Sequence, residues 1–116
     1  MTTQAGNEPT DVEIDAAVRV LKLLADPTRL RIVWALLHGE HSVNDLAEHV
    51  GARPPAVSQH LAKLRAADLV SVRRDGNRIF YAARNEHIER LAAEAFLHAD
   101  HLVGGGRHHR NGVKSA

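Results

Sequence analysis

The sequence contains no cysteine and few aromatic residues, and each shortage excludes a class of function. Without cysteine there is no disulfide framework, thiolate zinc knuckle, CxxC redox site or cysteine nucleophile. The aromatic residues are too few for a platform on which single-stranded nucleic acid stacks; they are Trp34, Phe80, Tyr81 and Phe96. No apolar run approaches the roughly 20 residues of a membrane helix, and the acidic N-terminus is unlike a signal peptide. We therefore expect an unanchored, cytoplasmic protein.

Histidine, by contrast, is abundant. The chain has 116 residues, 44% of them hydrophobic and 25% charged, which is typical of one globular domain with a modest core. Nine of these residues are histidines, far more than a chain of this length usually carries. Histidine chemistry is therefore one feature to explain.

The charges are segregated along the chain, although the formal net charge is only +1. Residues 1–26 and 79–101 carry an excess of acidic side chains, whereas residues 51–78 carry an excess of lysine and arginine. A basic middle between acidic flanks indicates one positive face, which is typical of a protein that binds a polyanion. A solvated charged surface would give the same totals, so charge alone does not decide between the two.

Hydrophobic periodicity predicts four helices in the first half of the chain. The first begins after Thr10, and the second begins at Asp26-Pro27, with Asp as N-cap and Pro in the first turn. The third begins after Ser42. The fourth begins at Pro54-Pro55 and buries residues at i, i+4 and i+7 spacing, which are Val57, Leu61 and Leu64.

The second half changes from helical to alternating periodicity and back. Residues 69–73 and 78–81 are rich in β-forming residues, and Asp75-Gly76-Asn77 between them is typical of a hairpin turn. Helical spacing returns from Asn85 to about Leu102, and the glycines at 104–106 should end the helix. We expect a disordered N-terminus at 1–9, one folded domain at 10–103, and a flexible, histidine-containing basic tail at 104–116.

Two short helices joined by a glycine turn, followed by a hairpin with arginines near its tip, predict a winged helix-turn-helix of order ααααββα. A helix fits the major groove of DNA, and a two-stranded wing reaches the neighbouring minor groove. On the fourth helix, Ser58, Gln59 and Lys63 lie opposite the apolar face, and Gln59 is suited to pair with adenine. The other candidates for DNA contact are Arg53, His60, Arg73, Arg74 and Arg78.

The motifs DPTRLRI, SVNDLA, SQHLAKLR and RRDGNRIFY together resemble the ArsR/SmtB family of metal-sensing winged-helix repressors, over roughly residues 15–102. The resemblance implies a homodimer built from the first and last helices, whose metal-free form binds operator DNA. It also implies that metal binding lowers the affinity for DNA. The absence of cysteine at SVNDLA excludes the thiolate site that some members carry on the third helix.

The histidines near the C-terminus form a second constellation. His98 and His101 are three residues apart on a helix, a spacing at which two imidazoles can share one ion. His87 lies on the same side but about 16 Å away at ~1.5 Å of rise per residue, too far for bonds of ~2.0–2.1 Å to one ion. An antiparallel copy of the helix removes this difficulty. The spacing therefore favours two symmetry-related metal sites across a dimer interface.

This site corresponds to the last-helix site of the family, where an Asp-x-His pair meets His-x-x-His of the partner subunit. Here Asn85 stands in place of the aspartate, and an amide is a poorer ligand than a carboxylate. The segment NEHIERLAAEAFLHADH followed by RHHR resembles the nickel- and cobalt-sensing actinobacterial branch, the KmtR-like and NmtR-like proteins. That resemblance implies ligands among His87, Asp100, His101, His108 and His109, with His98 as the rival of Asp100.

Imidazole and carboxylate donors without thiolates suit Ni(II), Co(II) or Zn(II) rather than cadmium, lead, arsenite or Cu(I). We therefore expect a repressor released from an inverted-repeat operator by Ni(II) or Co(II), with Zn(II) as the alternative effector and no small organic substrate. The alternative is a regulator of the same fold that senses another signal, or none. A hydrolase is disfavoured because no nucleophile elbow, HExxH or phosphate loop is present. His38, His41 and His49 are expected to be surface residues.

Overall fold

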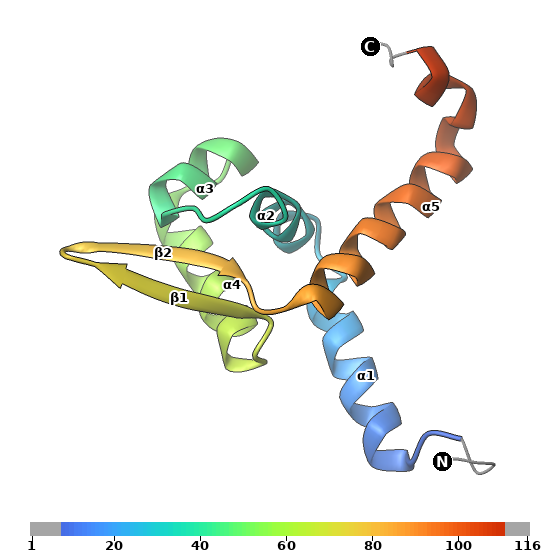
Figure 1. The fold of residues 1–116 in the computed structure, drawn as a ribbon, viewed down its shortest axis with the longest axis horizontal. Coiled ribbons are helices and arrows are strands. Elements are labelled where there is room, and N and C mark those ends of the chain that lie inside the picture. Colours follow the sequence, from blue (N-terminus) through green and yellow to red (C-terminus); the bar gives the residue numbers. More distant parts are fainter. Residues whose placement is uncertain (1–7, 111–116) are drawn as a thin grey trace.

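The computed structural model describes the backbone of residues 8–110 and the side chains of residues 8–104. Five helices and one hairpin follow each other in the expected order, so the structure is a mainly helical winged helix-turn-helix. The elements are α1 (Asp11–Leu24), α2 (Pro27–Leu36), α3 (Val43–Val50), α4 (Pro54–Ala66), β1 (Val70–Asp75), β2 (Arg78–Ala83) and α5 (Glu86–Arg110). Helices α2, α3 and α4 form the body, the hairpin projects from it, and α1 and α5 extend away as two arms (Figure 1).

The helices begin where the capping residues predict. Thr10 and Glu13 form a reciprocal capping box at the start of α1, and Asp26 accepts the Arg29 backbone N–H at the start of α2. Ser42 Oγ accepts the Asp45 N–H at the start of α3. Between α3 and α4, Gly51 has a φ of 69°, the left-handed conformation that the predicted turn requires.

The core lies where α2, α3, α4 and the base of the hairpin meet. The apolar stripe predicted for α4 is fully buried, and Leu46 of α3 and Ile32 of α2 join it. Two residues of α5, Ile88 and Ala92, complete this core from the other side. Helices α3 and α4 are thus packed against the same apolar cluster as the first two turns of α5.

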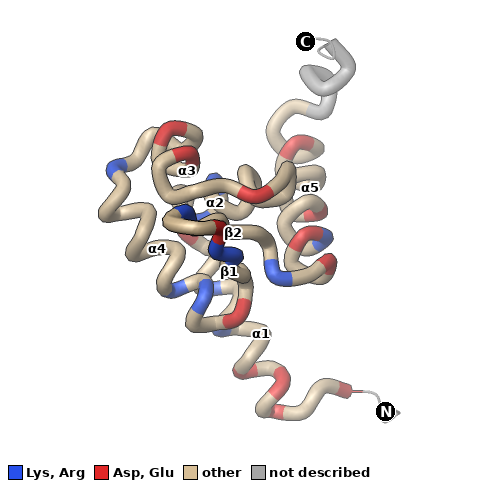
Figure 2. The backbone as a smooth tube through the Cα atoms, turned by 60° about the vertical axis from the view of Figure 1, so that its left-hand side comes forward, with Lys and Arg blue, Asp and Glu red and all other residues tan. Residues whose placement is uncertain are grey.

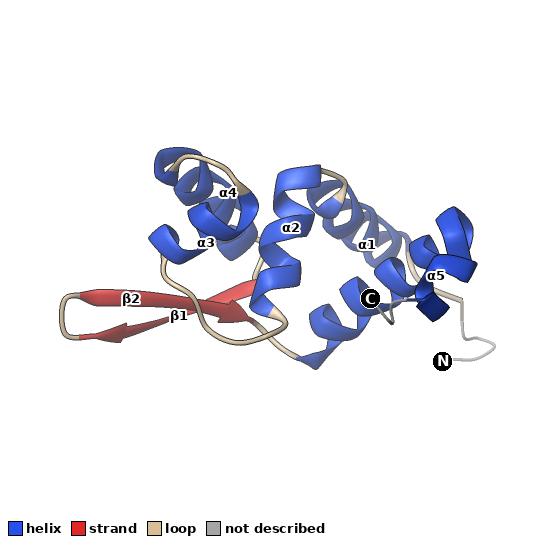
Figure 3. Ribbon diagram, turned by 90° about the horizontal axis from the view of Figure 1, so that it is seen from above, coloured by secondary structure: helices blue, strands red, loops and turns tan. Residues whose placement is uncertain are grey.

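The hairpin pairs β1 with β2 in antiparallel register, from Val70 opposite Ala83 to Asp75 opposite Arg78. Gly76, with a φ of 63°, and Asn77 form its two-residue turn, as predicted. The segment between α2 and α3 forms an isolated β-bridge with β2, in which His41 and Tyr81 exchange two backbone hydrogen bonds of 3.0 and 2.8 Å. Figure 3 shows the hairpin extending away from the helical part of the molecule.

Helix α5 runs further than its expected end at about Leu102. The helical backbone is interrupted at Gly104, whose φ of −179° and ψ of 64° are not helical, and it continues to Arg110. The glycine run therefore breaks the helix without ending it. The proposed division into domain and tail at residue 104 stays a prediction. Residues 1–7 and 111–116, which belong to the predicted terminal segments, lie outside the described residues.

Within residues 8–110, no helix is both long enough and apolar enough to span a membrane.

Candidate functional site

The exposed face of α4 carries the predicted base-reading residues. Val57, Leu61 and Leu64 are buried, so the opposite face presents Ser58, Gln59 and Lys63 to solvent. Arg53, also exposed, has extended backbone and precedes the two prolines of the first turn. Because prolines lack an N–H, this helix start leaves fewer donors without partners. The arrangement places a polar, basic face on the second helix of the helix-turn-helix.

The arginines of the hairpin are exposed but differ in their partners. Arg73 donates three hydrogen bonds of 2.9–3.1 Å to the carboxylate of Glu40, which holds the pKa of Glu40 below its usual range. Arg73 and Arg78 also lie over the ring of Phe80, at 4.9 and 5.0 Å from its centroid. Arg74 has no partner among the described residues, which makes it the hairpin arginine best suited to contact phosphate.

His60, a predicted phosphate contact, is only half exposed and is directed toward α2. Its Nδ1 accepts a hydrogen bond of 3.1 Å from Nε of Arg29. Sequence reasoning did not identify Arg29, because a contact between residues 31 positions apart leaves no local pattern.

The charged side chains are distributed unevenly among the elements. Lysine and arginine outnumber aspartate and glutamate on α4 and the hairpin, whereas the acidic residues outnumber the basic ones in the described part of α5 and, more narrowly, on α1 (Figure 2). The basic surface thus coincides with the helix and the hairpin that are shaped to enter DNA grooves.

The candidate metal ligands with described side chains all lie on α5. His87, His98 and His101 are exposed, and Asp100 is half-buried. In the part of the chain with described side chains, no three His, Asp or Glu residues come close enough to hold one ion. The side chains of His108 and His109 lie outside the described residues, although their backbone belongs to the last helical segment.

The donor chemistry of these residues fits a borderline divalent ion. Imidazoles and a carboxylate are ligands that Ni(II), Co(II) and Zn(II) accept. Nδ1 of His87 lies 3.2 Å from a guanidinium nitrogen of Arg90. A metal ion can also bind an imidazole such as that of His87 through its other ring nitrogen, Nε2.

Asn85 caps the same helix. Its side-chain oxygen accepts the backbone N–H groups of His87 and Ile88, at 2.9 and 3.2 Å. This role was missed in the sequence, where Asn85 stood out only as a weak ligand. The pattern of an N-cap, with asparagine directly before a helical run, was present and could have shown it.

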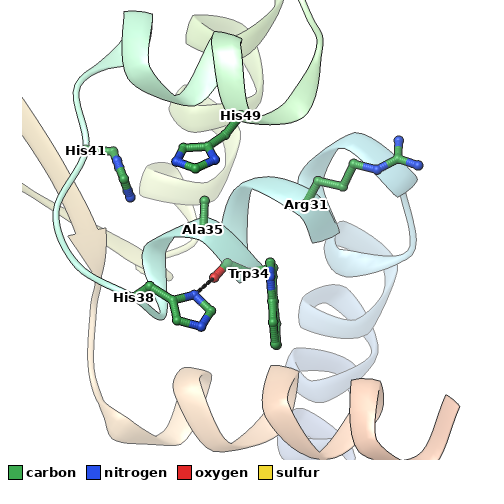
Figure 4. Close-up of a pocket in the computed structure, with 6 residues that line it drawn as sticks. All are labelled: Arg31, Trp34, Ala35, His38, His41 and His49. Carbon is green, nitrogen blue, oxygen red and sulfur yellow. Dashed lines mark hydrogen bonds between the residues drawn. The ribbon is translucent and has the colours of Figure 1, made fainter. Parts of the chain in front are cut away.

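Three other histidines meet at a surface hollow. His38, His41 and His49, expected to be scattered surface residues, line a space of about 440 Å³ between α2 and α3 (Figure 4). The rings of His41 and His49 lie edge to face with centroids 5.0 Å apart. Trp34, which borders the hollow, meets Phe96 of α5 with ring centroids 5.0 Å apart. The hollow is therefore adjacent to the contact between α2 and the candidate metal helix.

Comparison with known proteins agrees with this arrangement. Residues 26–72 match the family described as "Bacterial regulatory protein, arsR family". The chain is 48% identical over 112 residues to the HTH-type transcriptional regulator KmtR of Mycobacterium tuberculosis. The aligned region covers 95% of this chain and 86% of KmtR. The chain belongs to the ArsR/SmtB family. It is thus a DNA-binding transcriptional regulator and not an enzyme.

Two further proteins extend the comparison. NmtR of Mycobacterium tuberculosis is 40% identical over 95 residues, which are 81% of this chain and 79% of NmtR. Mb0332 of Mycobacterium bovis, solved as a homodimeric winged helix-turn-helix DNA-binding domain, superposes with a TM-score of 0.73 at 34% identity. That match covers 85% of this chain and 94% of the solved one. The predicted family and fold are confirmed.

Proposed function

We propose that this ArsR/SmtB regulator is a metal-responsive repressor, which binds operator DNA as a homodimer and is released by Ni(II) or Co(II), with Zn(II) as the alternative. The observation that carries the proposal is the row of exposed histidines on α5, His87, His98 and His101. Similarity to KmtR and NmtR supports a metal effector. Since a repressor acts where its operator lies, the proposal places the protein in the cytoplasm.

The homodimer is supported by apolar side chains left exposed on the two arms. Aliphatic side chains that normally avoid water are exposed along α1 and α5, at a density that indicates an interface. They are Val12, Ile14, Val18, Leu21, Leu91, Leu97, Leu102 and Val103. The homodimeric structure of Mb0332 is in line with this assembly.

The metal site follows from the length of α5. His87 and His101 are 14 residues apart on one helix, which separates them by about 21 Å at ~1.5 Å per residue. Only an antiparallel α5 of a second subunit can bring such residues to one ion, and this yields two equivalent sites per dimer. His98, Asp100, His108 and His109 are the further candidates. A bound ion would supply coordinate bonds that join residues of the two subunits.

On DNA, the proposed roles follow the exposure of each side chain. Gln59 and Ser58 read bases, whereas Arg53, Lys63, Arg74 and Arg78 hold phosphates. Arg73 and His60 have protein partners and contribute less to direct contact. Because the dimer is symmetric, it should occupy an imperfect inverted repeat with equivalent positions about one helical turn, or a multiple, apart.

Release of the operator by metal requires that the ion bind the conformer of low DNA affinity more tightly than the conformer of high DNA affinity. A ligand shifts an equilibrium only by its differential affinity for the two states. The test is isothermal titration of Ni(II), Co(II) and Zn(II) into the purified dimer, followed by operator binding with each metal. We expect two ions per dimer and weaker operator binding. Absence of metal binding would refute the proposal.

Truncation after Gly106 tests the last two histidines. If His108 and His109 complete a six-coordinate site, their loss should weaken Ni(II) and Co(II) much more than Zn(II), which accepts four ligands. Equal loss for the three metals, or no loss, would remove the tail from the site.

A second candidate function is that of a regulator with the same DNA site and another signal. The observation that favours it is the amide of Asn85, which caps α5 and provides no carboxylate at the position of the family aspartate. Operator binding that is unchanged by each of the three metals would support this candidate.

A further inference from the structure

Arg29, in the first turn of α2, connects three elements through three hydrogen bonds. Its backbone N–H donates to the Asp26 carboxylate at 2.9 Å. Its guanidinium donates through Nη1 to the backbone oxygen of Leu23 at 2.9 Å and through Nε to Nδ1 of His60 at 3.1 Å. All three bonds are partly buried. One side chain therefore joins the end of α1 to the middle of α4.

The two groups that accept hydrogen bonds from the Arg29 guanidinium lie at the end of α1 and beside the predicted base-reading residue of α4. Leu23 belongs to the last turn of α1, where carbonyl groups have no partner further along the helix. His60 directly follows Gln59, the predicted base-reading residue, and faces inward where Gln59 faces solvent. A contact that holds His60 therefore acts together with the buried apolar stripe of α4 to set the rotation of the helix about its axis, and with it the direction of Gln59.

We propose that Arg29 is a positioning residue for DNA binding, which holds α4 in its reading orientation against the end of α1 and does not itself contact DNA. The proposal rests on the DNA binding of the ArsR/SmtB family and not on a metal effector. A guanidinium suits this role because its donors are fixed in one plane and can serve two acceptors at once.

The contact requires an unprotonated Nδ1 on His60, because only that nitrogen has a lone pair to accept the Arg29 donor. The charged groups beside His60 are Arg29 and Asp26 at the start of α2, and Lys63 follows one turn later on α4.

The first test compares Arg29→Gln with Arg31→Gln. The two arginines lie on the same helix and lose the same charge, but Arg31 is exposed and has no hydrogen bond or ion pair to the described residues. Operator affinity is measured from about 50 to 200 mM salt, and circular dichroism and size exclusion check fold and assembly. We expect Arg29→Gln to lose about tenfold or more in affinity at every salt concentration. Arg31→Gln should lose less than about threefold.

The salt dependence distinguishes positioning from direct contact. Removal of a phosphate contact lowers the slope of log affinity against log salt by about one. We expect Arg29→Gln to leave this slope unchanged. A reduced slope, or equal losses for the two variants, would overturn the proposal.

A second pair of variants decides the matter even if Arg29→Gln fails to fold. His60→Asn keeps an acceptor oxygen close to the place of Nδ1, whereas His60→Leu keeps the volume and removes the acceptor. We expect His60→Asn to retain operator affinity within about threefold, because its oxygen can still accept the Arg29 donor. His60→Leu should lose about tenfold at pH 8.

The combined variant completes the test. If Arg29 and His60 act through one contact, the losses of Arg29→Gln and His60→Leu should not add in the double variant. Additive losses, or equal weakening by His60→Asn and His60→Leu, would overturn the role assigned to Arg29.

Discussion

The side-chain oxygen of Asn85 lies 2.9 Å from the backbone nitrogen of His87, so the residue that stands in place of the family aspartate holds the start of the candidate metal helix. Asn85→Ala should therefore destabilise the fold by about 1 kcal/mol, which denaturant unfolding measures. Asn85→Asp should keep the cap, because the two residues are equally good N-caps, and should raise the affinity for Zn(II) by adding a carboxylate. If Asn85→Asp leaves all metal affinities unchanged, position 85 lies outside the ion's reach.

Base reading and phosphate contact give different signatures. Gln59→Ala should relax sequence preference and cost ~1–3 kcal/mol at one base pair, because one bidentate contact is lost. Arg74→Ala should weaken binding to all sequences alike and lower the salt slope by about one. Binding to a panel of operator variants at several salt concentrations measures both. Unchanged preference and slope would show that α4 and the hairpin are not the contact surface.

The ion pair between Glu40 and Arg73 makes a prediction about acid. Hydrogen bonds from Arg73 hold the pKa of Glu40 below its usual range, and Glu40 in turn raises the pKa of Arg73. A lowered carboxyl pKa contributes stability that is present above the unfolded-state value of about 4.3 and is lost as the pH falls through the folded value. Glu40→Gln should therefore show a smaller drop in melting temperature than the wild type between pH 5 and pH 3. The pair is exposed, so a small difference is expected.

A mixed dimer distinguishes a shared metal site from a site within one subunit. His87→Ala and His101→Ala homodimers should each lose metal binding at both sites. In a heterodimer of the two variants, one site lacks both ligands and the other keeps both, so one ion should bind with nearly wild-type affinity. A site within one subunit predicts instead that neither site is restored. Metal titration of a heterodimer purified with two different affinity tags gives the answer.

Much of this fold follows from local signals. The two prolines at 54 and 55 and the buried stripe beginning at Val57 predict α4, and glycine at 76 predicts the hairpin turn. Glycine is a poor helix former, and the run at 104–106 was for that reason expected to end α5. The backbone instead departs from helical geometry at Gly104 alone and continues to Arg110.

The features that the sequence did not predict depend on contacts between distant residues. The β-bridge between His41 and Tyr81 joins the segment before α3 to the hairpin. His41 lines the hollow beside Trp34 together with two other histidines, His38 and His49. The orientation of His60 likewise depends on Arg29, on another helix. Periodicity shows which face of a helix is apolar, but it does not show which polar side chain another helix will engage.

Metal-dependent operator release is the central claim, and one measurement tests it most directly. A labelled duplex selected from a random library by the metal-free dimer is bound to that dimer, and fluorescence anisotropy is followed as Ni(II) is added, with Mg(II) as the control ion. The account predicts that stoichiometric Ni(II) weakens operator binding by roughly 5–150-fold, the usual range of allosteric coupling. It also predicts that Mg(II) has no effect and that His87→Ala binds the operator normally with or without Ni(II). Equal operator affinity of the wild type with and without Ni(II), Co(II) and Zn(II) would contradict it.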